Sequence, residues 1–316
     1  MRTTTRSKKI IMFGSRSSVQ DLKRGYKFLY DGNYKDGFPL VEARHPNKYP
    51  LAAGEKTPYH KSCYWYPGVS VKGKDVAVVH EGGRGDVINF IRYVKMLPEI
   101  GVKSITLIMA PEMVPLFSRL GYPTMNQPDR RNIDVRIWVM SLPALLLEHK
   151  KFPHEWTNKH YLSEGYLRNE KLTEVNDKVG LCWYTNSTAW NRDYRQIPHD
   201  LVENMIKKYD NIEFVPLQME STFLPRYFDV LNNMAISADK IQQLKAVITI
   251  DTSILHLAGA LGVPTYGLVG NGVKMDWRWL PKQRRTAWYD SVTCLYNEPA
   301  HEWRSALETA LKEVCR

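Results

Sequence analysis

Residues 247–269 read Val247-Ile-Thr-Ile-Asp-Thr-Ser-Ile-Leu-His-Leu-Ala-Gly-Ala-Leu-Gly-Val-Pro-Thr-Tyr-Gly-Leu-Val269, and they indicate a fold class on their own. The first four are apolar or β-branched, as in a buried strand. Apolar residues then recur with helical spacing, at Ile254, Leu257, Ala258 and Leu261. A second apolar run follows Gly262 and Pro264. We therefore predict a strand, helix, strand unit of a parallel sheet.

The polar step Asp251-Thr252-Ser253 lies between the first strand and the helix. Asp251 fits a helix N-cap, which would satisfy free amides of the first turn. Capping does not account for the two hydroxyls, or for His256 on the same helical face as Thr252. A helix N-terminus at the carboxyl edge of a parallel sheet also suits phosphate groups. Two interpretations stay open, a plain cap and a phosphate or diphosphate site.

The composition indicates an ordinary globular protein with an unusual charge. The 316 residues are 43% hydrophobic and 24% charged, enough for one large or two medium domains. No apolar run approaches the roughly 18 residues of a membrane span, and the N-terminus lacks the pattern of a signal peptide. We expect a cytoplasmic protein without membrane insertion. Its four cysteines have no metal-binding or redox spacing.

The net charge is +11, from 44 lysines and arginines against 33 acidic residues. Basic residues concentrate in residues 2–24 and again in residues 274–285. Such an excess favours polyanionic partners through long-range attraction. A solvated basic surface is the alternative interpretation.

Alternating strand and helix patterns predict two domains. We expect an irregular extension at 1–72, with one helix near 19–30. A Rossmann-like domain follows at 73–150, then a linker at 151–177, and a second Rossmann-like domain at 178–316. The predicted architecture is α/β, with two doubly wound domains facing across a cleft.

A glycine loop, Glu81-Gly-Gly-Arg-Gly-Asp86, follows the first strand of the N-terminal domain. Glycines allow the backbone to turn sharply and to approach a ligand. The spacing matches neither the dinucleotide fingerprint nor the Walker motif, so a NAD or ATP site gains little support. Asp86 fits either another N-cap or a general base at the mouth of the cleft.

No Asp-x-Asp pair and no His, Cys and Asp set with metal-ligand spacing occurs. A departing diphosphate would then be stabilised by a helix dipole and by basic side chains. Arg192 and Arg195, after the first strand of the C-terminal domain, are the candidates, because a guanidinium can donate two hydrogen bonds to an oxyanion. Surface arginines in a loop are the alternative.

Several short motifs occur in one order: Gly37-Phe38 with Glu42-x-Arg44, Glu81-x-Gly-x-Gly-Asp86, Phe90-x-Arg92-Tyr93, Ser141-Leu-Pro143, Gly180-Leu-x-Trp183 with Asn186 and Asn191, Leu217-Gln218, Asp251-Thr252 with His256-Leu-Ala-Gly-Ala-Leu-Gly262, Asp276-Trp-Arg-Trp279 and Trp288-Tyr289. Together they resemble the glycosyltransferase domain that follows tetratricopeptide repeats in bacterial proteins, which is related to the heptosyltransferases. The resemblance covers about residues 26–296, and no repeats are recognisable ahead of it in this sequence.

The resemblance implies a type-B glycosyltransferase fold, with an acceptor-side domain at 73–150 and a nucleotide-sugar-binding domain at 178–316. It also implies an inverting, metal-independent reaction whose substrate is a nucleotide sugar, such as a UDP-sugar, and which uses no cofactor. It implies that Asp86 is the catalytic base, with Gly83, Arg84 and Gly85 in the acceptor-side loop. The implied donor-binding residues are Arg195, Gln218, Asp251, Thr252, Ser253, His256, Asp276 and Trp277.

The acceptor is the most open part of the prediction. Because the chain is basic and bacteriophage DNA glucosyltransferases have this fold type, hydroxymethylated DNA bases are the leading prediction. A saccharide, a lipid-linked glycan or a protein is the alternative acceptor. Two other classes stay open, a nucleotide-sugar-binding module without turnover and a nucleic-acid-binding protein that uses the two domains only as a scaffold.

Overall fold

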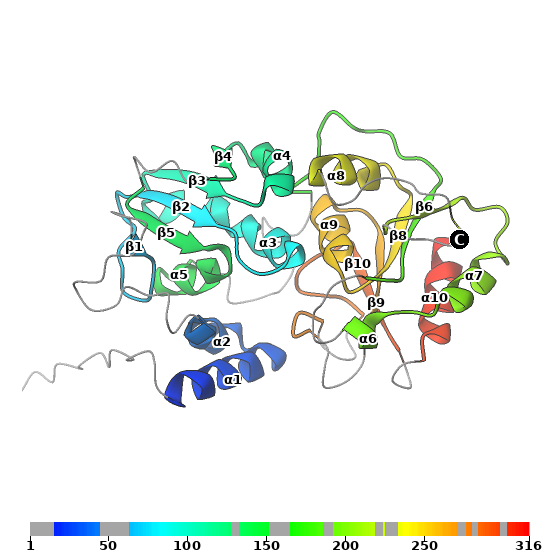
Figure 1. The fold of residues 1–316 in the computed structure, drawn as a ribbon, viewed down its shortest axis with the longest axis horizontal. Helices are drawn as coiled ribbons and strands as arrows, with labels where there is room; N and C mark the ends of the chain where they lie inside the picture. Colours follow the sequence, from blue (N-terminus) through cyan, green and yellow to red (C-terminus); the bar gives the residue numbers. More distant parts are fainter. Residues whose placement is uncertain are drawn as a thin grey trace, which may run out of the picture.

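The structure is a computed structural model that describes residues 16–44, 63–127, 133–151, 165–185, 192–218, 224, 233–270, 276–279, 284–297 and 302–315. These residues form two parallel five-stranded sheets with helices packed against them. In Figure 1 the first sheet lies on the left and the second on the right, and two N-terminal helices lie below the first.

The first sheet has the strand order β1-β5-β2-β3-β4. Its strands are β1 (Cys63–Tyr64), β2 (Asp75–Val79), β3 (Ser104–Ile108), β4 (Thr124–Met125) and β5 (Val135–Trp138). The helices α3 (Arg84–Ile91), α4 (Val114–Phe117) and α5 (Leu142–Glu148) connect or follow them, together with short 3-10 turns. The chain leaves β2 toward β3 on one side and returns to β5 on the other, so the order reverses between β2 and β5.

The second sheet has the order β10-β9-β8-β6-β7. Its strands are β6 (Val179–Cys182), β7 (Phe214–Pro216), β8 (Ala246–Ile250), β9 (Thr265–Val269) and β10 (Val292–Tyr296). Its helices are α6 (Arg192–Arg195), α7 (His199–Ile206), α8 (Met234–Gln242), α9 (Ser253–Leu261) and α10 (Arg304–Val314). Here the order reverses between β6 and β8, and all five residues of β8 are buried, as expected for a central parallel strand.

The predicted strand, helix, strand unit is confirmed as β8, α9 and β9. Every residue of α9 from Ile254 to Leu261 is buried, because the helix packs on its own sheet and also against α3 of the first domain. Figure 1 shows α3 and α9 side by side where the two domains meet. The first turns of these two helices therefore face the same region.

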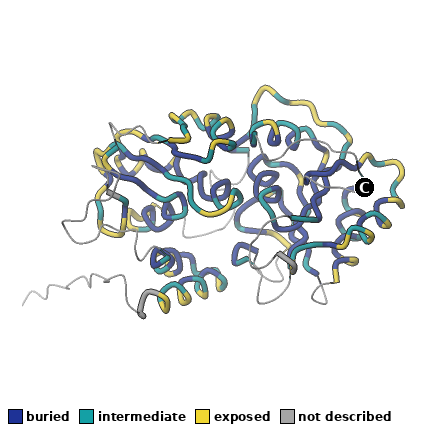
Figure 2. The backbone as a smooth tube through the Cα atoms, in the orientation of Figure 1, coloured by how far each residue is buried: buried dark blue, intermediate teal, exposed yellow. Residues whose placement is uncertain are grey.

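The helices α1 (Arg16–Tyr30) and α2 (Tyr34–Val41) form a hairpin within the predicted extension. They approach closely at glycines, since a Cβ on Gly37 would lie only 2.5 Å from Leu29 Cδ2. Tyr34 and Phe38 of α2 are buried, and the hairpin ends in a 3-10 turn, Glu42–Arg44. Residues 16–44 thus carry part of the hydrophobic core, as Figure 2 shows by their buried inner face.

The hydrophobic pattern does not reveal α2, β1, β4 or β10. β1 and β4 are only two residues long, and α2 contains both Gly37 and Pro39, which oppose helix formation in isolation. The helix α8 begins at Met234, because the side chain of Asn233 accepts from the backbone N–H of Ala235 at 2.9 Å. Contacts with distant parts of the chain and helix capping therefore decide where these elements form and where they begin.

We predict that Gly259→Ala lowers the free energy of unfolding by about 1–3 kcal/mol, the usual cost of overpacking. A Cβ at this position of α9 would lie 2.5 Å from the ring of Tyr289, which is itself buried. Urea denaturation measures the change. The control Gly270→Ala meets nothing closer than 3.5 Å and should be nearly neutral. Equal stability of the two variants would contradict the packing argument.

Candidate active site

The glycine loop turns the chain from β2 into α3. Gly82 has a φ of +76°, a conformation that favours glycine, and Gly83 is the helix N-cap. Asp86 is not the N-cap, one of the two interpretations of its sequence position. It is the third helical residue, and its Oδ2 accepts from the backbone N–H of Gly83 at 2.9 Å. This contact fixes the carboxylate at the first turn of α3.

The first turn of α9 is capped by Thr252, whose hydroxyl accepts from the backbone N–H of Ile254 at 3.3 Å. Asp251 is therefore not the cap that its sequence position suggested, because it lies one residue earlier and its side chain is buried. Burial, followed by the nearby carboxylate of Asp276, raises the pKa of Asp251 to about 6. Arg195 Nη1 donates to the carbonyl oxygen of Asp251 at 2.6 Å, which brings the guanidinium to this turn.

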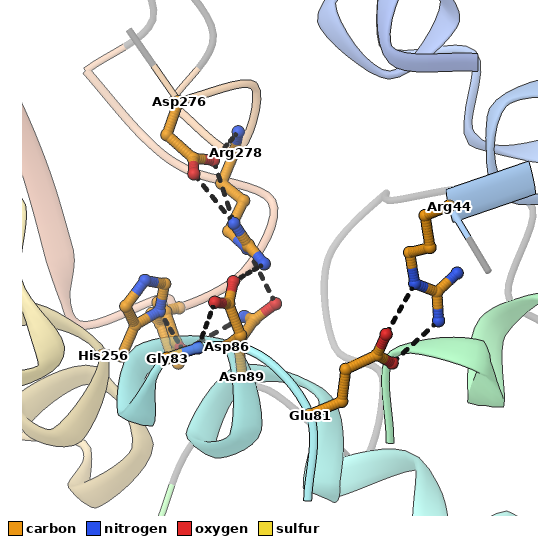
Figure 3. Close-up of polar contacts among 9 residues, drawn as sticks. Arg44, Glu81, Gly83, Asp86, Asn89, His256, Asp276 and Arg278 are labelled. Carbon is orange, nitrogen blue, oxygen red and sulfur yellow. Dashed lines mark hydrogen bonds and ion pairs between the residues drawn. The ribbon is translucent and has the colours of Figure 1, made fainter. Parts of the chain in front are cut away.

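A buried arginine joins the two domains at this point. The side chain of Arg278 is 3% exposed, and its Nη2 donates to Asp86 Oδ1 at 2.7 Å. Its Nη1 contacts both carboxylate oxygens of Asp276, at 3.1 and 2.9 Å (Figure 3). The rings of Phe90 and Trp277 lie 5.1 and 4.6 Å from the guanidinium carbon. One cation thus links carboxylates from both halves of the molecule.

Hydrogen bonds continue from Arg278 into the interior. Arg278 Nε donates to Asn89 Oδ1 at 3.2 Å, and Asn89 Nδ2 donates to the hydroxyl of Tyr289 at 3.0 Å. That hydroxyl lies 2.9 Å from His256 Nδ1. His256 also packs on Gly85, where a Cβ would lie 2.6 Å from His256 Cδ2. The glycine loop and α9 are therefore in direct contact.

A second ionic cluster holds the start of the glycine loop. Arg44 donates through Nε and Nη2 to the two carboxylate oxygens of Glu81, at 3.0 and 2.9 Å. It also contacts Glu42 at 2.6 Å and the hydroxyl of Ser141 at 2.8 Å. Glu81 follows β2 and Ser141 follows β5, so this arginine lies at the reversal of strand order in the first sheet. Figure 3 shows Arg44 with its hydrogen bonds to Glu81.

Other predicted residues have structural contacts. Gln218 is buried, and its Oε1 accepts from the backbone N–H groups of Trp183 and Tyr184 at 2.9 and 3.1 Å. Trp277 packs in an aromatic cluster with Tyr34, Phe38, Phe90 and Trp288. Arg84 pairs with Glu112 at 2.9 Å. These three side chains stabilise the loops around the site.

The structure brings together Asp86, Gly85, His256 and Asp276 in one region, with Gly83 bonded to Asp86. Thr252 and Ser253 open α9 at its start, beside Arg195 and Asp251. The side chain of Arg192, and residues 186–191 with Asn186 and Asn191, lie outside what the structure describes.

Three residues of the network were not singled out as functional from sequence: Asn89, Arg278 and Tyr289. Arg278 and Tyr289 occur in quoted motifs, and Asn89 is a wholly buried amide within the apolar stripe of α3. A polar residue between apolar neighbours in an amphipathic helix is the signal that could have indicated Asn89.

Among the described residues, no three His, Cys, Asp or Glu side chains gather where they could hold a metal ion. None of the helices in the described part of the chain is both long and apolar enough to cross a membrane.

The comparisons with known proteins concern fold alone. No family model matches the chain, and no curated protein is significantly similar in sequence. The structure is similar to the E. coli heptosyltransferase WaaC with ADP, at 12% identity and a TM-score of 0.53, covering 76% of this chain and 99% of that chain. WaaC with ADP-2-deoxy-2-fluoro heptose gives 12% identity, the same coverage and a TM-score of 0.50. The similarity confirms the predicted α/β fold with two parallel-sheet domains.

We predict that His256→Gln removes a pH-dependent loss of stability. Burial, together with Arg278, Arg92 and Arg195, holds the pKa of His256 well below 6.5. Below pH 6.5 His256 binds a proton in the unfolded chain but not in the folded chain. The free energy of unfolding therefore falls by up to about 1.4 kcal/mol per pH unit as the pH falls. Glutamine cannot titrate, so the variant lacks this component.

Urea denaturation between pH 7.5 and 5 measures both slopes. The control His149→Gln changes an exposed histidine at the end of α5 and should keep the slope of the unsubstituted protein. If the free energy of unfolding depends on pH with the same slope in the His256 variant and in the unsubstituted protein, His256 is protonated in the folded state and the prediction is wrong.

Proposed function

We propose that this protein is an inverting glycosyltransferase that moves a sugar from a nucleotide sugar to an acceptor hydroxyl, without a metal ion. The proposal rests mainly on one observation: the carboxylate of Asp86 lies at the first turn of α3, and the preceding residue, Gly85, packs on His256 of α9. A base and an anion-binding helix end thus share one region. The similarity in fold to WaaC, solved with ADP and with a fluorinated ADP-heptose, supports a nucleotide-sugar donor.

In the proposed reaction, the acceptor oxygen attacks the anomeric carbon while its proton passes to Asp86. The bond from that carbon to the diphosphate oxygen breaks, and the diphosphate keeps the electron pair. Each oxygen of Asp86 accepts one hydrogen bond from the protein, from Gly83 and from Arg278. A carboxylate has about four acceptor positions, so a further bond from a hydroxyl is possible.

The departing diphosphate would be stabilised at α9. The partial positive charge of the helix start favours an anion there. Arg195, which already contacts the carbonyl of Asp251 at 2.6 Å, adds a full charge beside the same turn. We assign Thr252, Ser253 and Arg195 to the diphosphate, and the Asp276 loop and Gln218 to the nucleotide end of the donor.

For the acceptor, we propose hydroxymethylated bases of DNA, in the cytoplasm. The net charge of +11 supports a polyanion, and Lys23, Arg24 and Lys27 of α1 are exposed along one part of the helix. The other predicted basic clusters fall mostly in residues 1–15, 271–275 and 280–283, which lie outside the described residues.

A transfer assay tests the donor and acceptor together. Radiolabelled UDP-sugars and ADP-sugars are each offered with hydroxymethylated DNA, unmodified DNA, oligosaccharides, lipid-linked glycans and proteins. We expect label on hydroxymethylated DNA and none on unmodified DNA. Label on a glycan or protein would support a glycosyltransferase but show that its acceptor is not DNA. If no sugar nucleotide changes the affinity for DNA and no donor is hydrolysed, the proposal that this protein is a glycosyltransferase is wrong.

We predict that Asp86→Asn lowers the turnover number by about 100-fold or more and leaves donor affinity nearly unchanged, because the amide cannot accept the proton. Turnover comes from the transfer assay and donor affinity from calorimetric titration. Asparagine keeps the shape and the hydrogen-bonding capacity toward Gly83. The control Asp75→Asn changes an aspartate at the opposite end of β2, paired with Lys103, and should retain full turnover. Unchanged turnover of the Asp86 variant would reject the base assignment.

A further inference from the structure

The hydrogen bonds around Asn89 have only one consistent direction. The Nε–H of Arg278 is a donor without acceptor capacity, so the side of the Asn89 amide that faces it, at 3.2 Å, must be the carbonyl oxygen. The opposite side is then the NH₂ group, which faces the hydroxyl of Tyr289 at 3.0 Å. Arg278 therefore fixes the amide orientation, and the Tyr289 oxygen accepts from Asn89.

The hydrogen of Tyr289 is then available for His256. The hydroxyl of Tyr289 also interacts with that of Tyr166, but Tyr166 already donates to the carbonyl of Ile88 at 2.6 Å and accepts from Arg92 at 3.3 Å. The imidazole Nδ1 of His256 lies 2.9 Å from the Tyr289 oxygen and can accept the remaining hydrogen. A neutral imidazole that accepts at Nδ1 carries its own hydrogen on Nε2.

His256 Nε2 faces the glycine loop. A Cβ built on Gly85 would lie 3.3 Å from this atom, next to Asp86 in the first turn of α3. The His256 residue is only 6% exposed, yet within the part of the chain that the structure describes its Nε2 has no hydrogen-bond partner. Burial and the surrounding arginines keep the ring neutral by lowering its pKa. An imidazole N–H that the fold leaves without a partner beside the first turn of α3 can donate to a ligand.

We propose that Tyr289 and Asn89 are positioning residues that lock His256 as a neutral Nε2–H donor toward the leaving diphosphate. The statement that His256 donates to the diphosphate rests on the proposed function. The position of the imidazole hydrogen on Nε2 does not depend on it. The same chain of bonds runs from Asp86 through Arg278, Asn89 and Tyr289 to His256, and its first three bonds each cross the domain boundary. One network of hydrogen bonds therefore fixes the position of the base, Asp86, relative to the leaving-group donor, His256.

Nitrogen-15 NMR of labelled histidine tests the tautomer directly in the isolated full-length protein. The chain has 9 histidines, and the His256 signals are identified by their loss in His256→Gln. We expect the hydrogen on Nε2 at neutral pH. In Asn89→Asp the new carboxylate accepts from Tyr289, so Tyr289 must accept from His256, and the hydrogen should move to Nδ1. The aspartate also gains Arg278 as a counterion, so this variant should fold.

A wild-type protein with its hydrogen on Nδ1, or an Asn89→Asp protein that keeps it on Nε2, would overturn the proposal. Neither result depends on catalysis, so failure here is distinct from failure of the proposed transferase activity.

A kinetic test follows once transfer is measured. Tyr289→Phe keeps the ring that packs on Gly259 and removes only the hydroxyl. We expect the turnover number to fall by about 100-fold, as when a transition-state donor is lost, with the acceptor KM unchanged. The control Tyr122→Phe, in the first domain away from α9, should retain turnover. Full activity of Tyr289→Phe would show that the tautomer has no part in the reaction.

Discussion

The site depends on one buried cation. Arg278 comes from a loop of the second domain, and its guanidinium is shared by Asp86 of the first domain and Asp276 of its own loop. A buried charge is costly unless it is paired and its remaining donors are bonded. Here Asn89 takes the Nε–H, and two aromatic rings lie within about cation–π distance. Separating the domains would remove Asp86 and Asn89 and leave Arg278 paired with Asp276 alone, so these contacts favour one arrangement of the two halves.

The N-terminal hairpin supports the same arrangement from outside. Tyr34 and Phe38 of α2 pack against Trp277, next to Arg278, and Phe38 also contacts Phe90 of α3. One apolar cluster therefore covers the arginine and its neighbours with residues from three parts of the chain. Arg44, at the end of the hairpin, holds Glu81 at the start of the glycine loop. The segment expected to be an irregular extension thus builds part of the site.

The two sheets place these groups because parallel strands end at one edge. The glycine loop follows β2 and the Asp251 turn follows β8, and each strand lies beside the reversal of order in its sheet. α3 and α9 begin at those points and pack against each other. A carboxylate at one helix start and the partial positive charge of the other are then available to one substrate. This juxtaposition is what the proposed transfer requires.

The sequence was sufficient for the local part of this structure. Helical and strand periodicity predicted β2, α3, β8, α9 and β9, because burial of one face repeats along a few residues. It also identified Asp86 and Thr252 at the starts of their helices. It could not identify the buried network, since Arg278 pairs with Asp86 across 192 positions and Asn89 bonds Tyr289 across 200. Such partners are matched by charge and by hydrogen-bond direction, and these contacts exist only after the domains have packed. The burial of Gln218 and Trp277 is also set by tertiary contacts, because Gln218 bonds the backbone of Trp183 and Tyr184 and Trp277 packs on Phe90.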